Sequence, residues 1–592
     1  MNVATLNMLM DVAIGDAEPD LIVRNARVVN MFMHDIEEAD ILVVSGRVAA
    51  IIDAGTAQAG SQTVVIDADG AYATPGLFDA HFHMGGSHLP VVALADALLA
   101  RGTTAIATDF YEMYTVAGPD GVREALAAVE PTGLKAKFLA PLHLLGLESV
   151  GTFGWDVRAE DFIEMLEWPE TVGVMEPPAS IVLARQPDVL RVIEHMTALG
   201  KTFAGHAPGL IDRSLQAYLS VGASSDHESQ TELEAVAKLR RGMQPMMRQG
   251  SAAPDLPNLV SMALNYPQST RWMMVCSDEV DPGDLVRTGH MDEKVRTVTR
   301  AGVDPITAIA MASTNVAEYF NVGADVGAIA PGRRADIVLV DDLDDFHAGT
   351  VIADGRLVSR AGEPVAPTET FDVPERLRSR VNLPRPLIAG DFDFAVESSA
   401  TGARVRTIGV EDGSLVSNAL ERELDVSDGV VQPDIASDVL NIAIVERHRG
   451  SGRIARAFAS GFGFGGGAVA MTYCHVYHNI LVVGASNEDM ALAANTIADF
   501  DGGIVVVRGG EIVASWRLPV VGVISDQPLN EAQPSFDAVN KAITGLGCKL
   551  VSPVLSLSFV ALPTIPALGL TDLGLYDVAS GEFLEPLLEL VH

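Results

Sequence analysis

The sequence predicts an α/β fold: a (β/α)8 TIM barrel with a small composite β-sandwich and a C-terminal α/β domain. Strand-like apolar runs alternate with helical patterns over residues 71–278, which is typical of βα units. Eight such units in about 210 residues match the size of a TIM barrel. Nearly every predicted strand ends in a polar or ionisable residue, and active sites of these barrels lie at those strand ends.

Eight segments qualify as barrel strands because they are short, apolar and bounded by turn residues. Helical patterns lie between most of them, for example over 187–200 and 231–243. The predicted strands are 71–83, 103–110, 135–143, 171–176, 201–207, 223–228, 244–250 and 271–278.

Two β-rich stretches flank the predicted barrel, at 20–71 and 327–362. Because they lie on either side of one α/β segment, we expect them to form one small sandwich made from both ends. A Pro-rich joint at 383–390 precedes a further region with its own strands and helices. The predicted division is 1–71 and 327–382 for the sandwich, 72–326 for the barrel and 383–592 for the C-terminal domain.

Composition restricts the partners of the protein. A formal net charge of −38 and a pI near 4.6 exclude nucleic acid and anionic membranes as expected partners. The three cysteines form no CxxC pair, which predicts a reducing compartment. No basic residue precedes Arg24, so we expect no secretory signal, and no apolar run reaches the ~18–20 residues of a membrane span. We therefore expect a cytoplasmic protein that acts on a small molecule and forms a homo-oligomer, a dimer or larger.

Six residues of metal-ligand type lie at the ends of five predicted strands. His81 and His83 share one strand face because side chains repeat every two residues. Each of the six residues, taken alone, is compatible with a structural role. Six ligand-type residues at the same end of five strands are hard to obtain by chance. Imidazole and carboxylate ligands suit Zn, Fe, Mn or Co rather than Ca or Mg. The predicted ligands are His81, His83, Glu176, His206, His227 and Asp278.

The chain resembles the bacterial adenine deaminases of the amidohydrolase superfamily over almost its whole length. The resemblance begins at DLIVRNARVVN (20–30) and PGLFDAHFH (75–83) and is specific in GHAPG (205–209) and SDHE (225–228). It continues through CSDEVDPGDLVRTGHMD (276–292) and the C-terminal SLSFVALPTIPALGLTDLGLYDV (556–578).

The resemblance implies a binuclear centre of two divalent transition metals (Zn, Mn or Fe). His81, His83 and Asp278 would hold one ion and His206 and His227 the other, with Glu176 and a hydroxide bridging them. The hydroxide would add to C6 of an aminopurine, and Asp278 would pass its proton to the leaving ammonia. Glu112 and Glu279 are further candidates for moving the proton.

The sequence departs from the family at several pocket positions. Met84-Gly85-Gly86 stands where the family carries a Glu-Ser-Ser segment, and Tyr111 stands at a family His. In the C-terminal region, Val476-Tyr477 replaces Asp-Ser. These changes predict a more apolar and aromatic pocket. The predicted substrate-binding residues are Gly85, Tyr111, His143, Arg248 and Tyr477.

Three functions are compatible with these residues. The first is hydrolytic deamination of adenine or a related 6-aminopurine. The second is hydrolysis of a different C–N bond, in a cyclic or N-acyl amide with a more apolar substrate, because the same hydroxide would serve. The third is a non-catalytic binding protein, against which the retention of all six ligands argues.

Overall fold

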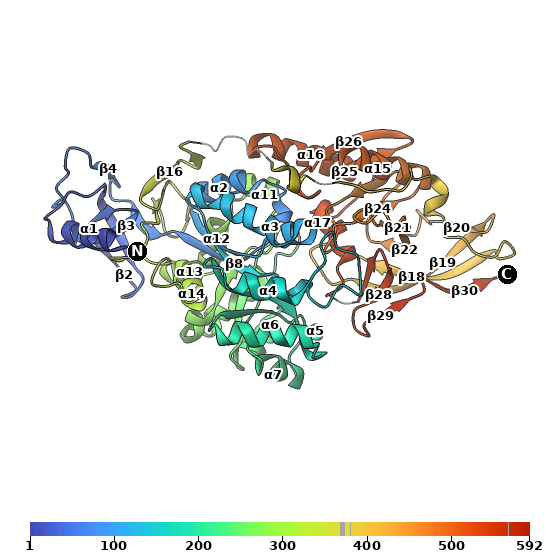
Figure 1. Cartoon of the computed structure of the whole chain (residues 1–592), viewed down its shortest axis with the longest axis horizontal. Coiled ribbons are helices and arrows are strands. Elements are labelled where there is room, and N and C mark those ends of the chain that lie inside the picture. Colours follow the sequence, from blue (N-terminus) through green and yellow to red (C-terminus); the bar gives the residue numbers. More distant parts are fainter. Residues whose placement is uncertain (367–372, 379, 566) are drawn as a thin grey trace.

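Eight parallel strands form the centre of the molecule in a computed structural model that describes residues 1–366, 373–378, 380–565 and 567–592 (Figure 1). The strands are neighbours in chain order. Backbone hydrogen bonds of 2.8 Å, from His83 N to Asp278 O and from Asp278 N to His81 O, join the first strand to the eighth. The predicted (β/α)8 barrel is confirmed. Its strands are β6 (Leu77–Phe82), β7 (Thr103–Thr108), β8 (Lys135–Ala140), β9 (Thr171–Pro178), β10 (Thr202–His206), β11 (Ser225–Asp226), β12 (Gln244–Arg248) and β13 (Met274–Cys276).

Helices surround the barrel and account for the apolar periodicity between the strands. In α6 (Pro187–Ala198), proline occupies the first turn, where its missing N–H costs nothing. The buried Val189, Val192, Ile193 and Met196 form one stripe of this helix. The other helices around the barrel include α2 (Val91–Ala100), α3 (Tyr111–Val129), α4 (Ala159–Leu166), α7 (Arg213–Leu219), α8 (Glu232–Leu239), α12 (Met291–Arg300), α13 (Pro305–Met311) and α14 (Thr314–Tyr319).

A nine-stranded sheet joins the two β-rich stretches that flank the barrel. Its central pairing is antiparallel, between a strand before the barrel and one after it, with Ile337 opposite Pro75. The single strand expected over 71–83 is therefore two strands, because the chain passes from this sheet into the barrel at Gly76. The sheet contains β1 (Leu21–Asn30), β2 (Asp35–Val44), β3 (Arg47–Asp53), β4 (Val64–Asp67), β5 (Tyr72–Pro75), β14 (Ile337–Val340), β15 (Thr350–Ala353), β16 (Arg356–Arg360) and β17 (Glu363–Pro364).

The C-terminal region is built on a ten-stranded sheet. Alternate side chains of its central strands face opposite ways: Ala443 packs in a cluster with Met490 and Ile497 of α15 (Asn487–Phe500), and Ile444 packs in the core shared with the barrel. The sheet strands are β18 (Gly402–Gly409), β19 (Asn418–Ser427), β20 (Val430–Val431), β21 (Leu440–Val445), β22 (Ile454–Ser460), β23 (Ala468–Met471), β24 (Ile480–Gly484), β25 (Gly503–Arg508), β26 (Glu511–Arg517) and β30 (Leu587–Val591).

Shorter elements of the C-terminal region complete the fold and approach the barrel mouth. They are α16 (Leu529–Gly545), α17 (Pro553–Ser558) and a three-stranded sheet of β27 (Leu568–Thr571), β28 (Gly574–Asp577) and β29 (Glu582–Leu584). The core shared with the barrel holds this region in place, so its loops can contribute to a site at the strand ends. Within the described part of the chain, no helix has both the length and the apolar character needed to cross a bilayer.

Candidate metal centre and its cavity

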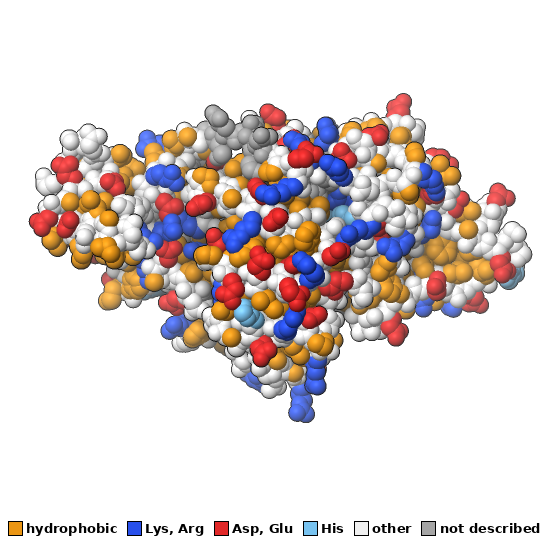
Figure 2. All heavy atoms as spheres, in the orientation of Figure 1, with side chains coloured by type: hydrophobic (Ala, Val, Ile, Leu, Met, Phe, Trp, Pro, Cys, Tyr) orange, Lys and Arg blue, Asp and Glu red, His pale blue; other side chains and the backbone are white. Residues whose placement is uncertain are grey.

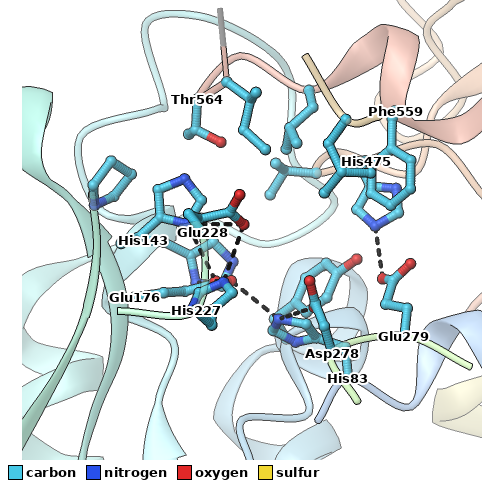
Figure 3. Close-up of a pocket in the computed structure, with 17 residues that line it drawn as sticks. His83, His143, Glu176, His227, Glu228, Asp278, Glu279, His475, Phe559 and Thr564 are labelled. Atoms are coloured by element: carbon cyan, nitrogen blue, oxygen red, sulfur yellow. Dashed lines mark hydrogen bonds and ion pairs between the residues drawn. The ribbon is translucent and has the colours of Figure 1, made fainter. Parts of the chain in front are cut away.

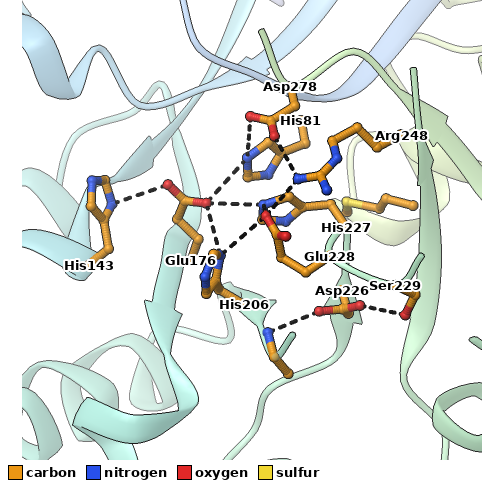
Figure 4. Close-up of polar contacts among 12 residues, drawn as sticks. His81, His143, Glu176, His206, Asp226, His227, Glu228, Ser229, Arg248 and Asp278 are labelled. Atoms are coloured by element: carbon orange, nitrogen blue, oxygen red, sulfur yellow. Dashed lines mark hydrogen bonds and ion pairs between the residues drawn. The ribbon is translucent and has the colours of Figure 1, made fainter. Parts of the chain in front are cut away.

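Ligand-type side chains from separate barrel strands meet around Glu176 (Figure 4). Glu176 Oε1 lies 3.2 Å from His83 Nε2. Its Oε2 lies 3.2 Å from His227 Nε2 and 3.4 Å from His81 Nε2. His206 Nδ1 lies 3.6 Å from the same oxygen, and Asp278 Oδ1 lies 3.8 Å from His81 Nε2. The structure therefore brings together all six residues that the sequence predicted as ligands.

The chemistry of this donor set fits a divalent transition metal. Four overlapping groups of three side chains, two of which include Asp109 or Glu228 beside the six predicted residues, place one nitrogen or oxygen atom each within 4.8 Å of one another. Neither ring nitrogen of the buried His206 has a hydrogen-bond partner among the described residues, an arrangement that is costly unless the imidazole coordinates an ion. Buried imidazoles that converge with carboxylates are the ligands of Zn, Mn and Fe sites.

Both carboxylates of the predicted ligand set lie on strained backbone. Glu176 has a φ of 40° and Asp278 a φ of 64°, in the left-handed region that residues with a Cβ rarely adopt. Such strain costs about 1–3 kcal/mol per residue and clusters at functional sites. The strained backbone at these two positions aims each carboxylate at the centre.

Asp109, which sequence reasoning did not select, supports the centre from behind. Its Oδ1 lies 3.1 Å from His83 Nδ1, so it can orient this imidazole and leave Nε2 for coordination. Burial opposes a charge on His83, but the carboxylates of Asp109 and Glu176 outweigh it and raise the pKa of the imidazole well above its usual value. Asp109 directly follows the second barrel strand. This position at a strand end is the feature of the sequence that could have identified it as a site residue.

Arg248 lies behind the carboxylates and is completely buried. Its Nη1 donates to Asp278 Oδ2 at 3.0 Å and to Glu228 Oε1 at 2.7 Å, and its Nε and Nη2 donate to Asp255 Oδ2. The sequence predicted Arg248 as a substrate-binding residue. In the structure it holds two carboxylates that line the cavity, Glu228 and Asp278. Glu228 was also missed, although it directly follows the predicted ligand His227 in the SDHE segment.

A cavity opens beside the centre, with about 490 Å³ of space not filled by atoms, its mouth included (Figure 3). The barrel contributes mainly polar groups and the C-terminal region mainly apolar ones. The lining residues are His83, Tyr111, His143, Glu176, Pro178, His206, His227, Glu228, Asp278, Glu279, Leu415, His475, Val476, Phe559, Leu562, Thr564 and Ile565.

Two of the five predicted substrate-binding residues, Tyr111 and His143, line this cavity. Within the described part of the chain, Gly85, Arg248 and Tyr477 do not. The Tyr477 hydroxyl donates to Leu147 O at 2.9 Å, and its ring packs 4.6 Å from that of Phe153. Tyr477 therefore holds the interface between the barrel and the C-terminal region.

Gly85 makes room for Glu112. Glu112 Oε1 accepts a hydrogen bond from Gly85 N at 2.6 Å, and a Cβ on residue 85 would lie 2.4 Å from that oxygen. The Glu112 carboxyl thus occupies space that a side chain at position 85 would need. Burial, with the nearby Asp109 charge, raises the pKa of Glu112 to about 8. Glu112 lies outside the cavity lining within the described residues.

Glu279, the second predicted proton-transfer candidate, ties the C-terminal region to the barrel. Its Oε2 accepts a hydrogen bond from the Tyr473 hydroxyl at 2.7 Å, and its Oε1 lies 2.8 Å from His475 Nε2. The His475 ring stacks on Phe559, with ring centroids 4.6 Å apart. This chain of contacts places an aromatic wall beside the cavity.

A buried ion pair beneath the centre gives a stability prediction. Asp226 accepts hydrogen bonds from Ala207 N, from Ser229 Oγ and from Lys238 Nζ, the last at 2.8 Å. We expect Lys238→Met to lower the free energy of unfolding by about 3–5 kcal/mol, because it leaves the Asp226 charge buried without its cation. Guanidinium-induced unfolding measures this loss. The exposed Lys541 supplies the control, Lys541→Met, and equal stability of the two variants would contradict the prediction.

Comparison with known proteins places this geometry in a family. Residues 190–358 match the amidohydrolase family, and residues 414–582 match the adenine deaminase C-terminal domain. The chain is 38% identical over 569 residues to an adenine deaminase of Desulfatibacillum aliphaticivorans, across 95% of this chain and 96% of that protein. It is 36% identical to an adenine deaminase of Moorella thermoacetica, across 96% of each chain. A third, from Dehalococcoides mccartyi, is 38% identical across 97% of this chain and 98% of its own length.

Proposed function

Because this chain belongs to the adenine deaminase family of the amidohydrolase superfamily, we propose that it converts adenine or a related 6-aminopurine and water to the 6-oxopurine and ammonia. The observation that carries the proposal is the convergence of six ligand-type side chains beside a cavity that the C-terminal region lines.

Two metal ions would share the six side chains. His81, His83 and Asp278 would hold one ion, His206 and His227 the other, and Glu176, whose two oxygens face different imidazoles, would lie between them. Bound divalent metal ions supply a nucleophile at neutral pH, because they lower the pKa of water toward ~7.

Asp278 is the proposed proton-transfer residue. Arg248 holds its Oδ2, and its Oδ1 lies 3.7 Å from His83 Nε2 on the cavity side. A carboxylate fixed in this way can accept a proton from the attacking water and return it to the leaving amino nitrogen. Glu279 is less suited to this role because both of its oxygens face C-terminal side chains.

The apolar wall of the cavity favours a second candidate function. Leu415, Phe559 and Ile565 would suit a more apolar substrate, such as a cyclic or N-acyl amide whose C–N bond the same centre could hydrolyse.

Substrate profiling of the metal-loaded protein tests the two functions against each other. We expect kcat/KM for adenine to exceed that for cyclic and N-acyl amides by at least ~10²-fold, since polar partners in a site carry most of its selectivity. N6-alkyl adenines belong in the panel, because the apolar wall should tolerate a larger substituent. A preference for an amide over every purine would replace the proposal with the second function.

We also propose several properties of the whole protein. The exposed Leu6, Met10 and Ile14 belong to α1 (Val3–Ile14), in the lobe at the left of Figure 1, where Figure 2 shows hydrophobic side chains beside acidic ones. These exposed apolar side chains support a homo-oligomer, which sedimentation would measure. Three buried free cysteines support a cytoplasmic location. The domain division at residues 71, 326 and 382 stays a proposal, with limited proteolysis as its test.

A further inference from the structure

Glu228 is a cavity-lining carboxylate that the six-ligand set does not use. It directly follows His227 and is 4% exposed. Its Oε1 accepts from Arg248 Nη1 at 2.7 Å and lies 3.2 Å from His227 Nε2. Figure 3 shows its carboxylate reaching into the cavity between His227 and Thr564. Glu228 therefore lies at the metal-ligand end of the cavity, not at its apolar wall.

Arg248 determines how Glu228 can act. This completely buried guanidinium is fixed from behind by Asp255, so the position of its Nη1 is set before any substrate enters. An arginine partner keeps a buried carboxylate charged and restricts its rotation. It also places a positive charge beside Oε1, which disfavours that oxygen as a metal ligand. The hydrogen bond that Glu228 makes to another described residue uses Oε1, which leaves Oε2 for a donor in the cavity.

The position of Glu228 determines which hydrogen-bond donor of a bound substrate it contacts. A carbon that reacts at the centre must lie near Glu176 and Asp278, so its substituents lie beside Glu228, and the rest of a ring extends toward Phe559 and Ile565. During hydrolysis of a 6-aminopurine, the amino nitrogen becomes a better donor as it gains a proton and positive charge. A fixed carboxylate beside that nitrogen stabilises the transition state more than the ground state.

We infer that Glu228 is a further catalytic residue, which accepts an N–H of the leaving amino group through Oε2 and so selects substrates with an amino group at the reacting carbon. The inference rests on the proposed deamination and adds a residue and a selection rule to it. The proton itself still travels through Asp278, and no bond to Glu228 forms or breaks.

The Glu228→Gln variant tests this inference in the metal-loaded protein. Glutamine keeps the size of the side chain but removes its charge. We expect kcat/KM for adenine to fall by about 10²–10³-fold, the usual effect of losing one preorganised electrostatic partner. The competitive inhibition constant of 6-chloropurine, which has no amino group, should change by less than about threefold, because the rest of the site is intact. Glu232, in the first turn of α8, accepts hydrogen bonds from Ser261 and Asn265 and is not among the described residues that line the cavity. The Glu232→Gln variant is therefore the control and should alter neither value.

Two results would overturn the inference. Loss of bound metal in Glu228→Gln, measured by elemental analysis, would make Glu228 a metal ligand. Equal weakening of 6-chloropurine binding and adenine turnover would make its role structural. Failure of the proposed function looks different: the metal-loaded wild-type protein would release no ammonia from any 6-aminopurine, whatever residue 228 is.

Discussion

We expect the Asp278→Asn variant to lose at least ~10²-fold in kcat for ammonia release, because an amide cannot take the proton that a general base must accept. The substitution keeps the size of the side chain, and Arg248 Nη1 can still donate to its carbonyl oxygen in place of Asp278 Oδ2. Metal analysis of the purified variant separates the two roles of Asp278. The prediction concerns the fraction of the protein that retains metal.

Glu279→Gln is the informative comparison for Asp278. Because Glu279 contacts Tyr473 and His475, we expect its replacement to raise KM through a displaced C-terminal wall more than it lowers kcat. Near-normal turnover by metal-loaded Asp278→Asn would show that another group moves the proton. Glu279 and Glu112 would then be tested in turn.

Removal of metal should have the largest effect of all. We expect the chelated protein to retain less than ~10⁻³ of its activity, because water has a pKa of 15.7 without a metal ion and yields almost no hydroxide at neutral pH. Reconstitution with Zn, Mn or Fe should restore ammonia release. Titration of the apoprotein should reach its maximum at two ions per chain if the centre is binuclear, and a maximum at one ion would contradict this.

Two single histidine variants separate the effect of losing metal from nonspecific effects of replacing a histidine. His206 contacts Glu176 inside the centre, whereas His195 lies on α6 with a surface contact to Glu167. We expect His206→Ala to lower metal content and activity together, and His195→Ala to change neither. Full activity in His206→Ala would remove this residue from the centre.

The barrel and the convergence of the predicted ligands were predictable because both are local in the sequence. Each strand has its own apolar run, and each ligand lies at the end of such a run, so parallel strands in a closed barrel must bring the ligands to one edge. The prediction was less accurate at 71–83, where one apolar run covers β5 and β6. Periodicity cannot detect a passage between two sheets when both strands are buried.

The substrate end of the site was less predictable. Glu228 lies in the SDHE segment and Asp109 in the predicted strand 103–110, but nothing in their spacing separates a residue that enters the cavity from one that supports it. Tyr477 illustrates the opposite case, since an aromatic residue in a segment that departs from the family pattern packs at an interface.

The order of residues by itself determined the α/β barrel, the six converging ligand-type residues and the family, because these follow from periodicity, strand ends and matching segments. Only the tertiary structure decided which side chains line the cavity. Leu415, Val476, Phe559 and Ile565 reach the barrel mouth from a region that begins more than a hundred residues after the last ligand. The orientation of Glu228 also depends on Arg248, 20 residues further along the chain, which Asp255 fixes from the segment that follows the same strand. The contacts of the four C-terminal residues with the barrel mouth are set by packing of the whole chain, and no local pattern encodes them.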